Sequence, residues 1–384
     1  MIRDADEALI RQNTAVLVDV DFDKIERNSL DELGLLASSN QISVAAIVES
    51  KRKYPDSATF VGKGKVAEIL EILVQTKAAM VIVNHDLSSV QQRNLSNALS
   101  CRVIDRTSLI LDIFSRRAQS YEGKLQVELA QLEHLSTRLI RGWTHLERQK
   151  GGIGLRGPGE TQLETDRRLL GKRVKLLKEK LVKLKRQREV QRRSRKRAAV
   201  FSVSIVGYTN AGKSTLFNRL VSAEAYAADQ LFATLDTTTR KLYLPGYGSI
   251  VVSDTVGFIQ SLPHTLVAAF RATLEETTQA DLLLHVVDAS SVNRDRQIAE
   301  VNKILSEIGA DTIPQILVLN KIDKTESNST ANCTRDEYDR ISAIRLSAKT
   351  GEGLEFLQIA MTEASNQSSA NQMDHFSPHR CVVQ

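Results

Sequence analysis

The segment FSVSIVGYTNAGKST, residues 201–215, decides the fold of the C-terminal half of the chain. A mostly apolar, β-rich run passes directly into a loop that matches the pattern G-x-x-x-x-G-K-[ST], and a helical run follows the loop. In such a unit the backbone N–H groups of the loop point at phosphate oxygens, and the helix dipole favours the same negative charge. The sequence therefore predicts an α/β domain with a phosphate-binding loop.

Each residue of this loop is expected to contact a nucleotide. Lys213 places a cation on the β- and γ-phosphates, and the hydroxyl of Ser214 is suited to ligate Mg²⁺. The other contacts are expected from Gly207, Tyr208, Thr209, Asn210, Ala211, Gly212 and Thr215.

A second predicted strand, residues 250–253, ends in Asp254-Thr-Val-Gly257. An Asp at the end of a strand near the phosphate loop is placed to hold Mg²⁺, usually through water. The N–H of Gly257 can approach the γ-phosphate because glycine has no side chain in the way. Thr255 and Val256 complete this part of the expected site. D-x-x-G alone is more often a turn, so the order of the motifs carries the interpretation.

The choice of base is predicted by Asn320-Lys-Ile-Asp323, which follows the strand at 317–319. The Asp323 carboxylate can accept two hydrogen bonds from guanine, whereas adenine would leave it buried and unpaired. Asn320 is expected to brace the phosphate loop and the base, and Lys321 to lie against the ring, with Ile322 in the same segment. The backbone N–H groups of Ser347, Ala348 and Lys349 can meet the guanine O6. The expected ligands are GTP and GDP.

Residues 13–118 alternate between β-rich and helical runs. We expect strands at 16–20, 43–48, 79–83 and 102–104, and helices at 22–37, 65–75 and 88–99. This alternation predicts a small parallel α/β domain.

Two long helices follow, at 122–149 and from about residue 160. Their apolar seams repeat at heptad-like spacing, which predicts an antiparallel helical hairpin. The first seam holds Leu125, Leu129, Leu132, Leu135, Leu139, Trp143 and Leu146, and the second holds Leu163, Leu170, Val174, Leu177, Leu181 and Leu184. Five glycines at 151–159 predict a flexible tip, although a plain linker is the alternative.

Positive charge is concentrated in the second long helix. Residues 167–197 contain 16 Lys or Arg and two acids, a net charge of +14 in a chain whose total is +6. A charged run is usually a solvated face, but this excess favours binding to the phosphates of structured RNA. The chain contains no apolar run long enough for a membrane span and no signal peptide, and its three cysteines stand far apart. These features predict a cytoplasmic location.

The motifs together resemble the HflX family, within the Obg–HflX group of translation-factor-type GTPases. The resemblance rests on DTVGFIQSLP at 254–263, on FATLD at 232–236, and on the segment GGIGLRGPGETQLETDRR at 151–168. It implies that Phe232, Ala233, Thr234, Leu235 and Asp236 form the first switch. Thr234 would then close on Mg²⁺ and the γ-phosphate, although the residues alone do not distinguish it from Thr237, Thr238 or Thr239. Thr237 stands where the family pattern has Pro.

The resemblance also implies a function. The expected catalytic residues are Lys213, Ser214, Thr234 and Gly257, and the expected metal ligands are Ser214, Thr234 and Asp254. Phe258 occupies the place of the water-orienting Gln of Ras-like proteins, so hydrolysis should be slow until a partner accelerates it. Some GTPases with Asn at the place of Asn210 use K⁺, which makes K⁺ a further candidate cofactor. The implied partner is the large ribosomal subunit, contacted through ribosomal RNA by residues 122–198, on stalled or idle ribosomes.

We expect a monomer with four parts: an N-terminal α/β domain (1–118), the basic hairpin (119–198), a P-loop GTPase domain (199–363) and a flexible tail (364–384). Three alternatives stay open. A large-subunit assembly factor would prefer precursor particles. An RNA-remodelling ATPase could only use a weak phosphate-binding segment at 62–65, which is more simply a turn with two lysines. A signalling switch without RNA would not need the basic hairpin. His85 and Asp86, adjacent at a strand end, are interpreted as a loop pair rather than as catalytic residues.

Overall fold

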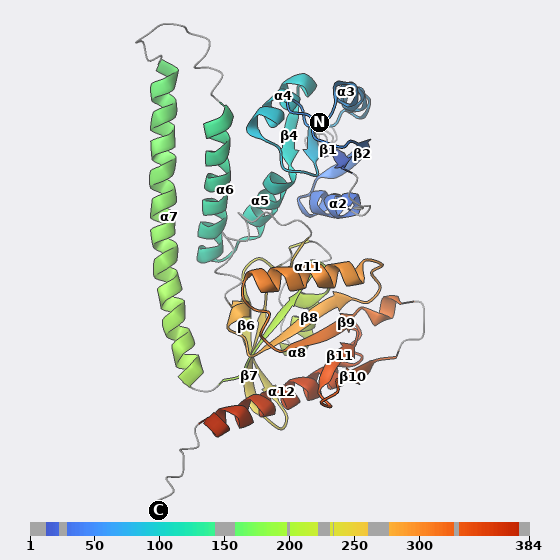
Figure 1. Ribbon diagram of the computed structural model, residues 1–384, viewed down its shortest axis with the longest axis vertical. Coiled ribbons are helices and arrows are strands. Elements are labelled where there is room, and N and C mark those ends of the chain that lie inside the picture. Colours follow the sequence, from blue (N-terminus) through green and yellow to red (C-terminus); the bar gives the residue numbers. More distant parts are fainter. Residues whose placement is uncertain are drawn as a thin grey trace, which may run out of the picture. The chain divides into compact units, whose positions relative to one another are not determined.

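The chain folds as two compact units, residues 1–184 and 185–384. The computed structural model describes residues 13–22, 29–142, 158–197, 200–221, 231–232, 234–259, 276–325 and 330–375 (Figure 1). The boundary between the units falls inside one helix, α7 (Pro158–Arg197). Within the described residues, no helix has the length and apolar character needed to cross a membrane.

The N-terminal unit is built on a four-stranded parallel sheet, as predicted. The strands are β1 (Thr14–Asp21), β2 (Ser43–Lys51), β3 (Met80–Val83) and β4 (Arg102–Asp105), in the order β2-β1-β3-β4. All three strand pairs are parallel. Alternate side chains of β1 point to opposite faces; Val16, Val18 and Val20 belong to a buried cluster with residues of α3 (Lys63–Thr76) and α4 (Ser89–Leu99).

The helices of this unit are α2 (Ser29–Ser39), α3 (Lys63–Thr76), α4 (Ser89–Leu99) and α5 (Arg106–Arg117). α4 begins with a capping box in which Ser88 and Gln91 satisfy each other's backbone N–H groups. α5 was not predicted. It starts where the side chain of Asp105, the last residue of β4, accepts a hydrogen bond from the backbone N–H of Ser108, and it buries Leu109, Ile110 and Phe114 among other side chains.

The predicted hairpin is present in its helices. α6 (Tyr121–Gly142) and α7 lie side by side (Figure 1), and Leu125, Leu129 and Leu177 form the buried centre of their contact. One residue of the predicted seam is wrong: Leu135 is 46% exposed. The tip at 151–157, together with Trp143 and Leu146, lies outside the described residues.

The C-terminal unit is built on a seven-stranded sheet in the order β10-β11-β9-β8-β5-β7-β6. Its strands are β5 (Ser202–Gly207), β6 (Thr238–Leu244), β7 (Gly248–Asp254), β8 (Leu282–Asp288), β9 (Gln315–Asn320), β10 (Asn332–Arg335) and β11 (Ile341–Arg345). The five central strands are parallel, and the edge strands β6 and β10 are antiparallel to their neighbours.

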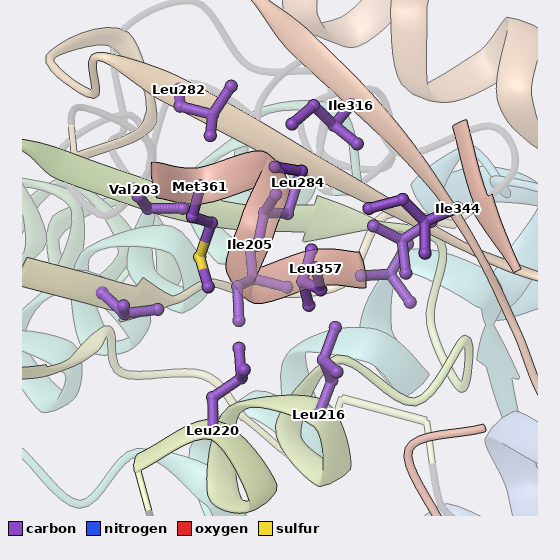
Figure 2. Close-up of a cluster of buried hydrophobic side chains, with 14 of the residues drawn as sticks. Val203, Ile205, Leu216, Leu220, Leu282, Leu284, Ile316, Ile344, Leu357 and Met361 are labelled. Carbon is purple, nitrogen blue, oxygen red and sulfur yellow. The ribbon is translucent and has the colours of Figure 1, made fainter. Parts of the chain in front are cut away.

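Helices α8 (Lys213–Val221) and α12 (Leu354–His375) cover the same face of this sheet. Leu216 and Leu220 of α8 and Leu357 and Met361 of α12 pack on apolar side chains of the central strands (Figure 2). Helix α11 (Arg294–Glu307) contacts β8. The predicted loose tail is wrong for residues 364–375, because α12 continues to His375; the Ser365 side chain in this stretch is fully buried. The division into four functional parts stays a prediction.

Candidate functional site

The phosphate loop joins β5 to α8, as the sequence predicts, and its two glycines are required by the backbone. Gly207 has φ +147°, and a Cβ there would come 2.1 Å from the carbonyl oxygen of Val286. Gly212 has φ +93°, and a Cβ there would lie 2.2 Å from Nδ2 of Asn320. Both positions combine a conformation that L-residues avoid with a contact that admits no side chain. The loop can therefore close tightly only with glycine at both places.

Lys213 lies at the centre of the loop and is buried. Its Nζ donates a hydrogen bond to the carbonyl oxygen of Tyr208 at 2.8 Å. Burial lowers the pKa of Lys213 to about 8; Asp254 acts against this shift, and the charge of Lys321 adds to it. A desolvated ammonium of this kind gains strongly from an anion, which is the environment that a nucleotide phosphate provides.

Three oxygen-bearing side chains converge beside Lys213. The Ser214 Oγ lies 2.6 Å from the Thr234 Oγ1 and 2.7 Å from the Asp254 Oδ2, and the last two atoms are 2.9 Å apart. Burial raises the pKa of Asp254, while the hydrogen bonds and the charge of Lys213 act in the opposite direction. The structure thus brings together all three predicted metal ligands. Among the candidate threonines Thr234 is the one in this cluster, whereas Thr239 bonds to Ser253 within the sheet.

The segment after β7 is locked to the phosphate loop through its backbone. The N–H of Thr209 donates to the Phe258 carbonyl at 2.7 Å, and the N–H of Phe258 donates to the Gly207 carbonyl at 3.2 Å. The Phe258 ring is fully buried. A Cβ on Gly257 would come within 2.9 Å of the Lys213 Nζ. Gly257 therefore lies against the phosphate-binding cation, and the position after it carries an apolar anchor instead of a polar group.

The base side of the site is a set of linked loops. Asn320 donates from Nδ2 to the Ala211 carbonyl and accepts at Oδ1 from the Ala348 N–H, both at 2.9 Å. The bond to Ala211 agrees with the predicted bracing of the phosphate loop, and the contact of Asn320 with the base stays a prediction. One oxygen of Asp323 accepts a hydrogen bond of 2.6 Å from the Ser347 hydroxyl. That bond orients the carboxylate, and Asp323 itself lines the cleft.

One cleft joins the phosphate and base sides. Its lining consists of Thr209, Asn210, Gly212, Lys213, Ser214, Thr215, Phe232, Thr234, Thr255, Gly257, Asn320, Lys321, Asp323, Lys324, Ala348 and Lys349. Several predicted residues are not part of this lining: Gly207, Tyr208, Ala211, Leu235, Asp236, Asp254, Val256, Ile322 and Ser347. Ala233 lies outside the described residues.

Two contributors were missed by sequence reasoning. Lys324 lines the cleft one residue beyond the predicted base-binding segment. Arg219 of α8 donates from Nη2 to the carbonyls of Thr350 at 2.8 Å and Lys349 at 3.3 Å. It ties the helix of the phosphate loop to the loop at 347–350. Arg219 belongs to no short sequence motif, and only its place on α8, the helix that follows the phosphate loop, could have pointed to it.

In the N-terminal unit, the residues that gave weak functional signals in the sequence have structural partners. Lys65 pairs with Glu68 on the first turns of α3. His85 Nε2 lies 2.9 Å from the Val20 carbonyl and 3.3 Å from Asp19, and Asp86 accepts a hydrogen bond from Thr107. His85 and Asp86 thus have separate partners, which supports their interpretation as a loop pair. A second nucleotide site at residues 62–65 stays the less favoured alternative.

Three family models match successive parts of the chain. Residues 27–115 match the family model "GTP-binding GTPase N-terminal", 117–195 match "GTP-binding GTPase Middle Region", and 202–321 match "50S ribosome-binding GTPase". The chain is 55% identical over 351 residues to the GTPase HflX of Escherichia coli strain K12, covering 91% of this chain and 82% of that protein. It is 47% identical over 357 residues to the GTPase HflX of Caldanaerobacter subterraneus subsp. tengcongensis, covering 93% and 82%.

A solved structure supports the fold. The crystal structure of SsGBP in complex with GDP covers 93% of this chain and 99% of its own chain, with a TM-score of 0.52 and 24% identity. The sequence identities to the HflX proteins are far above the level at which family membership is in question, and they extend over both units. The chain belongs to the HflX family of GTPases, and it binds and hydrolyses GTP.

Proposed function

We propose that this GTPase binds the large ribosomal subunit in its GTP-bound form and leaves the subunit when GTP is hydrolysed. The proposed targets are stalled or idle ribosomes in the cytoplasm, and the acting species is a monomer. The observation that carries the proposal is the charged surface of α7. The description of the family model over residues 202–321, "50S ribosome-binding GTPase", supports the same partner.

The basic side chains of α7 face solvent along most of its described length. Lys172, Lys175 and Lys183 are exposed, while Arg173 and Lys178 form ion pairs with Glu128 and Glu133 of α6. These two ion pairs engage two of the 16 Lys and Arg residues between residues 167 and 197, where the net charge is +14. A stiff helix with such a surplus suits the closely spaced phosphates of folded RNA. Residues 122–198 are therefore the proposed contact with ribosomal RNA.

Mg²⁺ fits the cluster beside Lys213. Hard divalent cations prefer oxygen ligands, and Ser214, Thr234 and Asp254 supply three such groups. The second carboxylate oxygen of Asp254, Oδ1, is buried and has no hydrogen-bond partner among the described residues. These residues would hold the ion, which when bound neutralises charge on the β- and γ-phosphates.

The residues of this chain then account for slow intrinsic hydrolysis. Lys213 stabilises negative charge on the phosphates, and Gly257 lines the same cleft without a side chain. Phe258 cannot orient an attacking water, because its ring is buried and apolar. The missing group must come from another residue or from the partner. Ribosomal particles should therefore stimulate hydrolysis by orders of magnitude.

K⁺ is a further proposed activator. Asn210 is held in the left-handed region at φ 59° and lines the cleft, so its side chain is available to a monovalent cation near the phosphates. Hydrolysis without ribosomes should be faster in K⁺ than in Na⁺ for the natural protein, and this difference should vanish in Asn210→Ala. Equal rates in the two salts for the natural protein would refute the K⁺ proposal.

The test of the main proposal is steady-state GTP hydrolysis with and without large subunits. The double variant Lys175→Glu/Lys183→Glu should lose most of the stimulation while its affinity for GTP stays nearly intact. The control, Lys53→Glu/Lys303→Glu, changes the net charge equally at exposed sites outside α7 and should be stimulated normally. Stimulation should also fall as salt rises, because phosphate contacts release counterions.

Two results would count against the proposal. Equal stimulation in both double variants would remove α7 from the ribosome contact. Stronger binding to precursor particles than to mature large subunits, measured by co-sedimentation with a GTP analogue, would favour the assembly-factor alternative instead.

A further inference from the structure

A carboxylate outside the four nucleotide motifs lies next to the base-binding segment. Asp288 is the last residue of β8, and in the parallel pairing of β8 with β9 it stands opposite Asn320. It is not among the residues that line the cleft. Its side chain is 20% exposed. Nothing in the motifs assigns a function to it, so its partners decide what it does.

Both oxygens of Asp288 have defined partners. Oδ2 lies 2.9 Å from Nζ of Lys321, and Oδ1 accepts hydrogen bonds from the N–H and the hydroxyl of Ser290 at 3.0 and 2.6 Å. Burial alone would raise the pKa of Asp288, but the bonds from Ser290 and Lys321 outweigh it and hold the pKa below its usual value. The group is thus an anchored, ionised carboxylate.

The same ammonium reaches the phosphate loop. Lys321 Nζ donates to the Asn210 carbonyl at 2.7 Å, in addition to its bond with Asp288. The stem of Lys321 runs past the phosphate loop, where a Cβ on Gly212 would lie 3.9 Å from Cε. The end of β8 and the phosphate loop are therefore both bound to the Lys321 ammonium, through Asp288 and the Asn210 carbonyl. Lys321 also lines the cleft.

Lys321 would not hold this position well without a counter-charge. Its backbone is in the left-handed region, at φ 66° and ψ 36°, which is unfavourable for a residue with a Cβ. Its side chain is 15% exposed, and its charge adds to the lowering of the pKa of Lys213. Two cations that share a cleft repel each other. A carboxylate behind Lys321 keeps its charge on the base side and leaves the phosphates to Lys213.

We propose that Asp288 is a positioning residue for guanine-nucleotide binding, which holds the Lys321 ammonium against the Asn210 carbonyl and thereby slows nucleotide release. Asp288 acts through Lys321 and does not touch the nucleotide. Its effect should therefore appear in the dissociation rate and be independent of the exocyclic groups of the base. The chemical step, which takes place at the phosphates, should be spared.

The experiment measures release of fluorescent GDP from the full chain by stopped flow. Asp288→Asn should release GDP about tenfold faster, the factor expected when a charge-assisted hydrogen bond is lost. Asp288→Glu, which keeps the carboxylate, should recover most of the natural rate. Asp295→Asn is the matched control, because it removes one acidic charge from a side chain that is 88% exposed on α11. Single-turnover hydrolysis of bound GTP should change less than about twofold in all three variants.

Two further measurements separate positioning from simple stabilisation. In a Lys321→Met background, Asp288→Asn should have no additional effect on release, since its route of action is gone. The factor by which Asp288→Asn accelerates nucleotide release should be the same for GDP and for IDP, which lacks the 2-amino group. An unchanged release rate in Asp288→Asn, or a full tenfold effect in the Lys321→Met background, would overturn the proposal. If Asp288→Asn does not fold, the comparison of Asp288→Glu with Lys321→Met decides: nearly natural release in Asp288→Glu together with faster release in Lys321→Met supports the bridge, and natural release in Lys321→Met refutes it.

Discussion

A buried histidine makes the stability of the C-terminal unit depend on pH. His285 lies in β8, at the centre of the sheet, with Val206 of β5 on one side and Leu317 of β9 on the other. It is 2% exposed, and its Nε2 has no hydrogen-bond partner among the described residues. Burial lowers its pKa from 6.5 to about 4, and the nearby charge of Lys213 acts in the same direction. The folded state therefore holds this imidazole neutral.

The sign of the effect follows from proton binding. Between pH 6.5 and about 4 the unfolded chain carries a proton on His285 that the folded chain lacks. Stability then rises with pH through this window and is lost as the pH falls. One pKa unit corresponds to 1.36 kcal/mol, so the full window is worth about 3 kcal/mol and the step from about pH 7 to pH 5 about 2 kcal/mol. Replacing the imidazole by a group that does not titrate should abolish this contribution to the pH dependence of the free energy of unfolding.

The assay compares His285→Leu with the natural protein in the absence of nucleotide. Urea unfolding is followed by amide hydrogen exchange in β8, so that unfolding of the N-terminal unit does not contribute. Altered packing in His285→Leu adds an offset that does not depend on pH, and the difference in free energy of unfolding between the two proteins should shift by about 2 kcal/mol in favour of the variant between about pH 7 and pH 5. His285→Gln, which keeps a polar group, should show the same shift.

The reasoning would be refuted if stability depended on pH in the same way in the natural protein and in both variants. If the stabilities of the natural protein and of both variants fall in parallel as the pH falls, the acid sensitivity arises from carboxylates whose pKa is lowered in the folded state, such as Asp288, and His285 does not titrate differently in the two states. A shift of opposite sign would mean that the folded protein binds the proton more tightly than the unfolded chain.

Three other substitutions test the nucleotide site and the contact of α6 with the end of β4. Asp323→Asn should weaken GTP binding by several kcal/mol and favour xanthosine triphosphate, whose C2 oxygen complements an amide; a direct titration measures both. Gly257→Ala should slow single-turnover hydrolysis at least tenfold, because its Cβ would lie 2.9 Å from the Lys213 Nζ, and a rate near that of the natural protein would remove Gly257 from the catalytic set. Arg138→Met leaves the Asp105 carboxylate, 1% exposed, without its charged partner; the N-terminal unit should lose about 3 kcal/mol in urea unfolding followed by exchange in β4, and an unchanged midpoint would contradict this.

The residues of the nucleotide site could be predicted from the sequence alone. Lys213, Asp254 and Asn320 each stand at or just after the carboxyl end of an apolar run, and parallel strands bring those ends to one edge of the sheet. Local order and residue type were sufficient, because each motif is a short segment whose backbone dictates its contacts. The same reasoning gave the parallel N-terminal sheet and the two hairpin helices, whose periodicity is long and regular.

Tertiary structure alone decided the features that depend on distant contacts. Thr234 was singled out among four threonines by its distance to Asp254, and Asp288 gained its role from a lysine 33 positions away. Leu135 keeps the heptad spacing of its helix and is nevertheless exposed, while the polar segment after Ala364 stays helical because part of it packs on the unit. Strand order and register place these residues, and neither is written in the local periodicity of the chain. Partners far apart in sequence become neighbours only when the whole sheet has formed.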